Sequence, residues 1–271
     1  MANEKDKVFA GSIPDIYDQF LVPLIFEPYA ADLARRLAAF SPKHVLETAA
    51  GTGVLTRAIA KQLPEVDIVA TDLNQPMLDR AATTIQRRAL AWRQADALAL
   101  PFDDRSFDAV VCQFGVMFFP DKVAGFREAR RVLRAGKPFL FNAWDHIGSN
   151  EFVNVASEAL AEMFPDDPPR FMERTPHGYH DPNAIRRDVD EAGFTVVTVE
   201  AVAARSRASS AYDAAFAYCQ GSPWRAEIEA RGGSAGLQNA TQHVADALVK
   251  RFGRGPIDGS IAAFVVTARA P

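Results

Sequence analysis

Residues 44–63 have the pattern of a short buried strand, a tight turn of small residues and the first turns of a helix. Apolar residues lead into the turn, and Leu55 and Ile59 then recur at the spacing of one helix face. Gly51 and Gly53 supply the positive φ and the missing Cβ that allow main chain to approach a ligand closely. The unit therefore predicts an α/β fold with a nucleotide-like cofactor at the turn.

Strand-like and helix-like segments alternate from about residue 44 to residue 204. This alternation predicts a parallel sheet with helices on both faces. The expected strands cover 44–48, 67–71, 91–95, 107–113, 137–143, 195–202 and 261–268. The expected helices include 76–88, a segment with Val123, Phe126 and Leu133 on its inward face, and one that opens at Asp181–Pro182 and closes at Gly193.

Two classes of cofactor use a turn of this kind. The dinucleotide fingerprint requires a third glycine three residues after Gly53, but Thr56 stands there. Glu47, just before the turn, would place a carboxylate close to a pyrophosphate, which is unfavourable, whereas a cationic cofactor would be attracted. The charges therefore favour a cationic cofactor over a dinucleotide.

Further patterns follow the turn in chain order. Together with the turn they are Glu47-x-Ala-x-Gly51-Thr52-Gly53, Asp72-Leu73-Asn74-x-x-Met77-Leu78, Gln94-Ala95-Asp96-Ala97, and the segments 100–108 and 126–137. In this order they resemble successive motifs of the class I S-adenosylmethionine-dependent methyltransferases, and within them the ubiquinone/menaquinone-biosynthesis-type small-molecule group. The resemblance covers roughly residues 41–144. Ala49 departs from the usual glycine, which concerns only the local geometry of the turn.

The resemblance implies both a fold and an activity. The fold is α/β, with a Rossmann-like, seven-stranded, mostly parallel sheet sandwiched by helices, an antiparallel seventh strand, and helical insertions that form a cap. The activity is methyl transfer from S-adenosyl-L-methionine to an oxygen, carbon or nitrogen nucleophile of a small molecule by in-line displacement. An NAD(P)-dependent oxidoreductase and a catalytically silent S-adenosylmethionine-binding protein are the alternatives.

Roles for individual residues follow from the motif match. Asp72 would accept hydrogen bonds from both ribose hydroxyls, or else act as an ordinary helix cap. Asp96 would accept from the adenine amine beside the Ala97 amide, or else be a turn aspartate. Glu47 would order the turn or attract the cationic end of the cofactor without touching it. The expected cofactor-binding residues are Tyr17, Thr48, Ala49, Gly51, Thr52, Gly53, Asp72, Leu73, Met77, Asp96, Ala97, Gln113 and Phe114.

No catalytic residue is assigned, because displacement on a sulfonium needs alignment and exclusion of water more than a conspicuous catalytic group. His146, His177 and His180 lie where they could face the acceptor as a general base, although a lone histidine is more often structural. Several aromatic residues would suit an aromatic or isoprenoid-like acceptor, or would simply form a core. They are Phe118, Phe119, Trp144, Phe164, Phe171, Tyr179, Phe216 and Trp224.

The chain divides into an N-terminal helical segment, residues 1–40, and a methyltransferase domain, residues 41–271. The first is expected to cover the cofactor site, with Tyr17 shielding the sulfonium through a cation–π contact, or else only to cover the sheet. Insertions near 145–180 and 208–258 should pack over the carboxyl ends of the strands as a substrate lid. The alternatives are that they thicken the fold or form a dimer contact.

The bulk composition narrows the partners. The net charge of −4, without a basic stripe, argues against a nucleic-acid or anionic-membrane surface. The run after the fourth strand, residues 113–116, also lacks the Asn/Asp-Pro-Pro-aromatic pattern typical of enzymes that methylate base amines. Cys112 and Cys219 form neither a disulfide framework nor a metal-ligand pattern. We expect a cytoplasmic protein without a membrane span or metal, and a small-molecule acceptor as partner. The sequence leaves open whether the protein is a homodimer.

Overall fold

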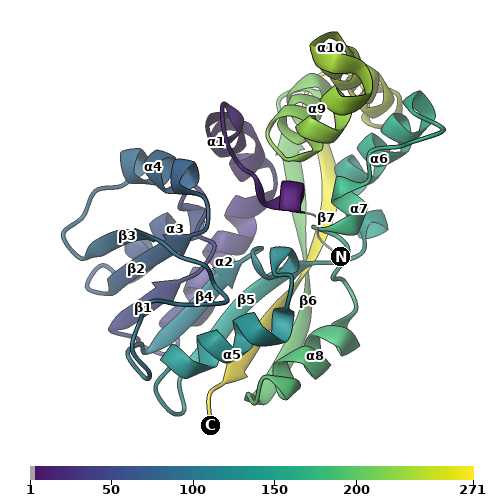
Figure 1. The fold of residues 1–271 in the computed structure, drawn as a ribbon. Helices are drawn as coiled ribbons and strands as arrows, with labels where there is room; N and C mark the ends of the chain where they lie inside the picture. The colour runs from purple at the N-terminus through teal and green to yellow at the C-terminus, as the bar shows by residue number, and fades with distance from the viewer. Residues whose placement is uncertain (1–3) are drawn as a thin grey trace.

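The computed structural model describes residues 4–271 and contains one seven-stranded sheet with the order β3-β2-β1-β4-β5-β7-β6 (Figure 1). The strands are β1 His44–Glu47, β2 Asp67–Asp72, β3 Leu90–Gln94, β4 Ala109–Gln113, β5 Pro138–Trp144, β6 Thr195–Ala208 and β7 Ile257–Arg269. Strands β1 to β5 pair in parallel, and β7 runs antiparallel to both β5 and β6. The predicted fold class, including the antiparallel seventh strand, is confirmed.

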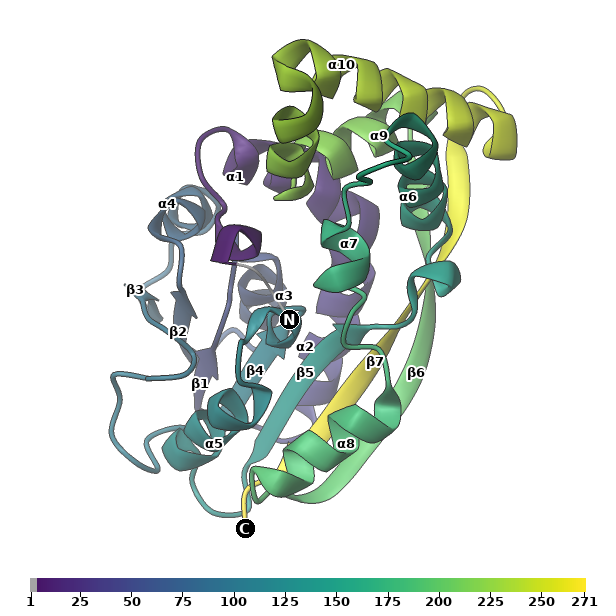
Figure 2. The ribbon, with the colours of Figure 1, turned by 45° about the vertical axis from the view of Figure 1, so that its right-hand side comes forward.

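Helices cover both faces of this sheet. They are α2 Glu27–Ala38, α3 Val54–Gln62, α4 Gln75–Thr84, α5 Lys122–Val132 and α8 Pro182–Glu191. In Figure 2, α5 and α8 lie in front of the sheet and α2 and α3 behind it. Every residue of β4 and β5 is buried, as expected for parallel strands covered on both faces. The Asp121 and Asp181 side chains cap α5 and α8 by accepting from backbone N–H groups in the first turn.

One helix is shorter than expected. The segment predicted as 76–88 leaves the helical conformation after Thr84, and Ile85 is extended. The hydroxyls of Thr83 and Thr84 donate to carbonyls one turn back, and Arg87 donates instead to the carbonyls of Pro64 and Val66. These local bonds of β-branched residues compete with continuation of the helix.

Strands β6 and β7 are longer than expected and extend past the rest of the sheet. Residues 203–208 look too polar for a strand, yet Arg205 and Arg207 both bond the Asp258 carboxylate across the ladder. Cross-strand pairs of opposite charge stabilise an antiparallel ladder. The extension brings the second insertion above the carboxyl ends of the central strands (Figure 1).

The insertions form a helical layer at that end of the molecule. Its helices are α6 Glu151–Met163, α7 Phe171–Arg174, α9 Ala211–Gln220 and α10 Trp224–Phe252. Figure 2 places them together, beside β6 and β7 and above the end of β5. Trp224 is fully buried and its indole N–H donates to the carbonyl of Pro169, which ties the two insertions together. Helix α10 is interrupted at Gly233, whose φ is +65°.

The N-terminal segment crosses the same end of the sheet. It comprises the 3-10 helix η1 Glu4–Lys7, α1 Ile13–Ile16, the π-helix η2 Tyr17–Phe26 and then α2. Asp6 is buried and its carboxylate accepts two bonds from the Arg174 guanidinium and one from the Thr175 hydroxyl. These bonds fix the start of the chain against α7. Within residues 4–271, none of the helices combines the length and apolar character needed to cross a bilayer.

Candidate functional site

Two adjoining cavities lie where the central parallel strands end. The turn cavity has an empty volume of about 840 Å³, and the apolar cavity one of about 580 Å³. The turn cavity is lined by Lys7, Phe9, Tyr17, Ala49, Gly51, Asp72, Leu73, Asn74, Met77, Ala95, Asp96, Ala97, Leu98, Gln113, Phe114, Gly115, Phe118, Phe119 and Pro120. The apolar cavity is lined by Phe9, Tyr17, Leu21, Ile25, Phe26, Phe114, Phe118, Trp144, Asn150, Val153, Phe171, Met172, Pro176, His177, Tyr218 and Ser222.

The glycine turn forms one wall of the turn cavity. Ala49, Gly51 and Gly53 all have positive φ, of +52°, +56° and +81°. A Cβ on Gly115 would lie 2.4 Å from the Ala49 Cβ, so glycine at 115 makes the room that the extra methyl at 49 requires. Gly115 therefore compensates for Ala49, which stands where the motif usually has glycine.

Asp72 joins the turn to the end of β2. It is 7% exposed, its Oδ2 accepts from the Gly51 N–H at 2.9 Å, and its Oδ1 accepts from the Asn74 N–H at 2.8 Å. Burial raises the pKa of this carboxyl, while the backbone bonds oppose the rise. A carboxylate offers about four acceptor sites, so Asp72 can brace the turn and still receive ligand hydroxyls.

Asp96 lies across the turn cavity, after β3. One of its oxygens accepts from the Leu98 N–H at 2.9 Å, and the side chain is exposed. Ala97 lines the cavity beside it, and Leu73 and Met77 contribute apolar surface. The sheet order places β3, β2 and β1 side by side, which explains why acids after β2 and β3 meet at one cavity.

Tyr17 and the residues after β4 form the wall between the cavities. The Gln113 amide donates to the carbonyl of Phe26 at 2.9 Å, which ties β4 to the π-helix. Phe114, with φ +53°, lines both cavities, and so does Tyr17. The Tyr17 hydroxyl lies 3.9 Å from where a Cβ on Gly51 would stand. Burial, with Asp72 and Asp18 nearby, raises the pKa of this hydroxyl.

Three of the expected cofactor-binding residues lie behind the turn rather than on the cavity. The Thr48 N–H donates to the carbonyl of Val111 in the sheet, and Thr52 is buried. A Cβ on Gly53 would lie 2.8 Å from Trp92, so Gly53 permits close packing of α3 against β3. The motif match identifies the turn, but it does not tell which of its residues face outward.

Glu47 also lies behind the turn. It is 1% exposed and accepts a 2.5 Å bond from the Thr56 hydroxyl at the start of α3. Burial raises the pKa of Glu47 to about 8, against the effect of the Thr56 bond. The position fits the expectation that Glu47 orders the turn. A carboxyl that keeps its proton at neutral pH does not supply the negative charge that was expected to attract a cationic cofactor.

The turn cavity also contains residues that the motif match did not give as cofactor contacts. They are Lys7, Phe9, Asn74, Ala95, Leu98, Gly115, Phe118, Phe119 and Pro120. Asn74 and Ala95 stand inside the quoted motifs, so their position was available from the sequence. Phe9 lies far from any motif. The bonds of Asp6 to α7 and a bond from the Phe9 N–H to Asn74 Oδ1 at 3.3 Å place it at the cavity.

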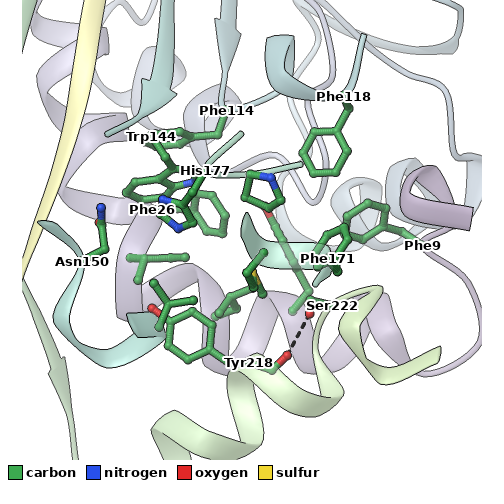
Figure 3. Close-up of a pocket in the computed structure, with 16 residues that line it drawn as sticks. Phe9, Phe26, Phe114, Phe118, Trp144, Asn150, Phe171, His177, Tyr218 and Ser222 are labelled. Carbon is green, nitrogen blue, oxygen red and sulfur yellow. Dashed lines mark hydrogen bonds between the residues drawn. The ribbon is translucent and has the colours of Figure 1, made fainter. Parts of the chain in front are cut away.

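The three candidate histidines differ in their position relative to the apolar cavity. Only His177 lines it (Figure 3). Its Nδ1 lies 2.8 Å from the carbonyl oxygen of Asp145. Burial lowers the pKa of His177 to about 4. His146 is exposed and accepts from the Gly148 N–H, and the Nδ1 of His180 bonds the carbonyl of His177. Those two rings do not line the cavity.

Only some of the aromatic residues considered for acceptor binding line a cavity. Phe118, Trp144 and Phe171 line the apolar cavity, and Phe119 lines the turn cavity. The remaining four line neither cavity and serve packing or local bonds: Phe164, Tyr179, Phe216 and Trp224.

Comparison with known proteins places the matched region at the turn cavity. Residues 45–136 match the family model described as a methyltransferase domain. A demethylmenaquinone methyltransferase of Deinococcus radiodurans is 36% identical over 134 residues, which are 48% of this chain and 56% of that protein. The ubiquinone/menaquinone biosynthesis C-methyltransferase UbiE of Paracoccus denitrificans is 39% identical over 107 residues, 37% of this chain and 42% of that protein. The chain spans about half the length of these relatives.

Solved structures share the whole fold at low sequence identity. The YcgJ protein of Bacillus subtilis has a TM-score of 0.57 at 18% identity, covering 89% of this chain and 98% of that chain. The cyclase SpnF has a TM-score of 0.58 at 18% identity, covering 90% and 81%. Residues 45–136 are therefore similar to the methyltransferase domain of ubiquinone/menaquinone-biosynthesis methyltransferases, and the fold is that of the solved structures.

Proposed function

We propose that this protein transfers the methyl group of S-adenosylmethionine, held in the turn cavity, to a small molecule held in the apolar cavity. The observation that carries the proposal is the shared wall: Phe9, Tyr17, Phe114 and Phe118 line both cavities. A cofactor whose reactive group reaches this wall would meet an acceptor on its other side. The arrangement supplies the alignment and close approach that a displacement reaction needs.

The residues of the turn cavity suit the cofactor from one end to the other. Asp72 would accept from the ribose hydroxyls with the sites left by its backbone bonds, and Asp96 would accept from the adenine amine. The aromatic rings of Tyr17 and Phe114 would face the sulfonium and favour its charge. The cofactor supplies a methyl group on a positively charged sulfur, which departs as a neutral thioether. The chain contributes position, apolar surroundings and exclusion of water.

The lining of the apolar cavity indicates which kind of acceptor the protein binds. None of its lining residues carries a formal charge at neutral pH, since His177 is kept neutral by burial. An acceptor that buried a carboxylate or phosphate there would lose its hydration without gaining a partner. The family match covers residues 45–136, whereas most residues that line this cavity lie outside that range, so the relatives' acceptors are not carried over. We propose the insertions as the lid of this cavity, because α6, α7 and α9 contribute its lining.

A second candidate function is cofactor binding without methyl transfer. The cyclase SpnF shares this fold, so the fold is compatible with chemistry other than methyl transfer. A dinucleotide is less compatible, because the position of the third glycine is Thr56, whose hydroxyl is engaged by the buried Glu47. A homodimeric state, the absence of nucleic-acid binding and a cytoplasmic location remain predictions.

Calorimetric titration tests the cofactor without knowledge of the acceptor. S-adenosylhomocysteine, NADH and NADPH would be titrated into separate samples of the same protein. We expect micromolar binding of the thioether and no measurable heat from either nicotinamide nucleotide. Binding of a nicotinamide nucleotide alone would overturn the proposal and favour an oxidoreductase. Thioether binding with no turnover across a broad acceptor panel would favour the silent binding protein.

A further inference from the structure

Most polar atoms in the apolar cavity already have partners in the protein. The Asn150 amide bonds the carbonyls of His146 and Ala262 and accepts from the Ala262 N–H. The Ser222 hydroxyl donates to the carbonyl of Tyr218 (Figure 3). These groups hold the helical layer together and are not available to a ligand.

Two well-buried groups in the same cavity are different. Within residues 4–271, neither Nε2 of His177 nor the hydroxyl of Tyr218 has a hydrogen-bond partner, although the residues are only 6% and 2% exposed. Neither atom belongs to the buried polar atoms closed off from both solvent and partners. Buried polar groups in proteins are normally bonded. Both atoms are therefore open to the cavity and to whatever occupies it.

The hydrogen-bond network assigns the tautomer of His177. Its Nδ1 lies 2.8 Å from the carbonyl oxygen of Asp145, which can only accept, so Nδ1 bears the hydrogen. In the neutral ring, Nε2 then carries a lone pair and acts only as an acceptor. The Asp145 carbonyl also fixes the ring plane, as second partners do for catalytic histidines.

The surroundings keep this ring neutral. Burial has the largest lowering effect on its pKa, and the nearby His146 and His180 act in the same direction. The Asp145 backbone bond and carboxyl act in the opposite direction. The Trp144 ring lies 5.9 Å away and the other titratable groups lining the cavity are the hydroxyls of Tyr17 and Tyr218. At neutral pH the lone pair on Nε2 is thus available.

We propose that the acceptor is an uncharged, largely apolar molecule with a hydroxyl group, and that Nε2 of His177 receives the proton of that hydroxyl. The inference rests on the proposed methyl transfer and adds the acceptor class and a catalytic residue. A ligand with one hydroxyl on an apolar body matches a cavity whose walls are aromatic and whose open polar atoms are few.

The step balances in atoms and charge. The oxygen's electron pair forms the new bond to the methyl carbon, the bonding pair of the sulfur–methyl bond stays on sulfur, and the hydroxyl proton moves to Nε2. One positive charge is lost at sulfur and one appears on the imidazole, which later releases its proton to water. The net charge of the two cavities stays constant during the step. Without a base, the same displacement would leave the positive charge on a protonated ether oxygen, a far stronger acid than an imidazolium, so transfer of the proton to Nε2 stabilises the product.

A fluorescent probe tests the proton transfer apart from turnover. 2-Naphthol is apolar, carries one hydroxyl and becomes a strong acid on excitation, and its anion emits at longer wavelength than the neutral form. It would be added to the protein saturated with S-adenosylhomocysteine. We expect saturable binding with emission from the anion, because Nε2 accepts the proton inside a cavity that excludes water. Naphthalene, which lacks the hydroxyl, tests whether that group contributes to binding. 2-Naphthoate, which carries a charge, should not bind.

Two variants of His177 make the test specific. His177→Phe keeps an aromatic ring without nitrogen, and His177→Asn keeps an N–H for the Asp145 carbonyl without a basic nitrogen, in case the first does not fold. Both should bind 2-naphthol and lose the anion emission. His146→Asn is the matched control, since His146 is exposed and does not line the cavity, and it should keep the anion emission.

The outcomes separate this inference from the function on which it rests. Loss of S-adenosylhomocysteine binding in the unaltered protein would count against the proposed function. If the thioether binds but 2-naphthol does not, or if 2-naphthoate binds equally well, the acceptor class is wrong. If anion emission survives in both His177 variants, the proton goes elsewhere and the catalytic role of His177 is wrong.

Discussion

Phe114 stacks on Trp144 with the ring centroids 3.8 Å apart and the ring planes 9° from parallel. Phe114 lines both cavities, whereas Trp144 lines only the apolar one. The stacked pair is therefore part of the partition between the proposed cofactor and the proposed acceptor. A positive φ is uncommon for a bulky residue, and its presence at Phe114 marks a conformation that the surrounding packing holds in place.

Replacing Phe114 with leucine should weaken S-adenosylhomocysteine binding more than it weakens the fold. The change removes the stacking energy, about 0.5–1.5 kcal/mol beyond buried area, and one face of the partition. Phe126→Leu is the control, since Phe126 is fully buried against β5 and lines neither cavity. Calorimetry and urea unfolding of both variants compare the two effects. Equal loss of affinity in both would mean that Phe114 acts through general stability alone.

Asp72→Ala should weaken S-adenosylhomocysteine binding by about 2–4 kcal/mol, since it removes charge-assisted bonds to the ribose. It also frees the Gly51 N–H, so circular dichroism must first show that the variant is folded. Asp79→Ala is the control, since Asp79 is exposed on the neighbouring helix and does not line the cavity. Unchanged affinity in folded Asp72→Ala would overturn the ribose assignment.

Glu47→Gln should change how stability depends on pH. Burial raises the pKa of Glu47 from 4.5 to about 8, so the folded state holds a proton that the unfolded state releases. Stability from this group is complete below pH 4.5 and is lost as the pH rises towards 8. Because a difference of one in pKa corresponds to about 1.4 kcal/mol, glutamine should gain on the order of 5 kcal/mol relative to the natural protein between these limits. Urea unfolding across this range measures the difference, with the exposed Glu65→Gln as control. Parallel pH profiles for natural protein and Glu47→Gln would contradict the neutral, buried carboxyl.

Asp6→Asn should release the start of the chain while the rest stays folded. The variant loses the charged pair with Arg174, whose guanidinium keeps its contact with Glu227 at 2.6 Å. We expect faster hydrogen exchange in residues 8–16 and weaker S-adenosylhomocysteine binding, because Phe9 and Tyr17 would no longer be held over the cavity. Asp258→Asn, which removes an exposed pair with Arg205 and Arg207, should change neither. Unaltered exchange in Asp6→Asn would show that other contacts hold the segment.

The sheet and the turn cavity could be predicted from the sequence because their signals are local. The strand–turn–helix unit and the acids at Asp72 and Asp96 each follow a buried strand, and the parallel sheet brings those strand ends together. The same signals could not orient side chains within the turn. Of the contacts that they indicated, Thr48, Thr52 and Gly53 are not among the residues that line the cavity.

The rest of the site depends on contacts between distant parts of the chain. Asp6 and Arg174 are separated by 168 residues, and no periodicity or motif predicts that they pair. The choice of His177 over His146 and His180 depends equally on the path of the first insertion, which carries four prolines and little regular pattern. The polar ends of β6 and β7 pair along a ladder that also carries the bonds of Arg205 and Arg207 to Asp258, and no local pattern predicts that pairing.

The side chains that border both cavities have a thermodynamic consequence. A molecule in either cavity fixes the rings of Phe9, Tyr17, Phe114 and Phe118 that the other molecule must also meet. The two binding free energies are then coupled, and the coupling is reciprocal: the factor by which cofactor tightens acceptor binding equals the factor by which acceptor tightens cofactor binding. A screen of acceptors against the protein without cofactor measures affinities that lack this coupling. A true substrate will therefore stand out only when the turn cavity is filled with cofactor.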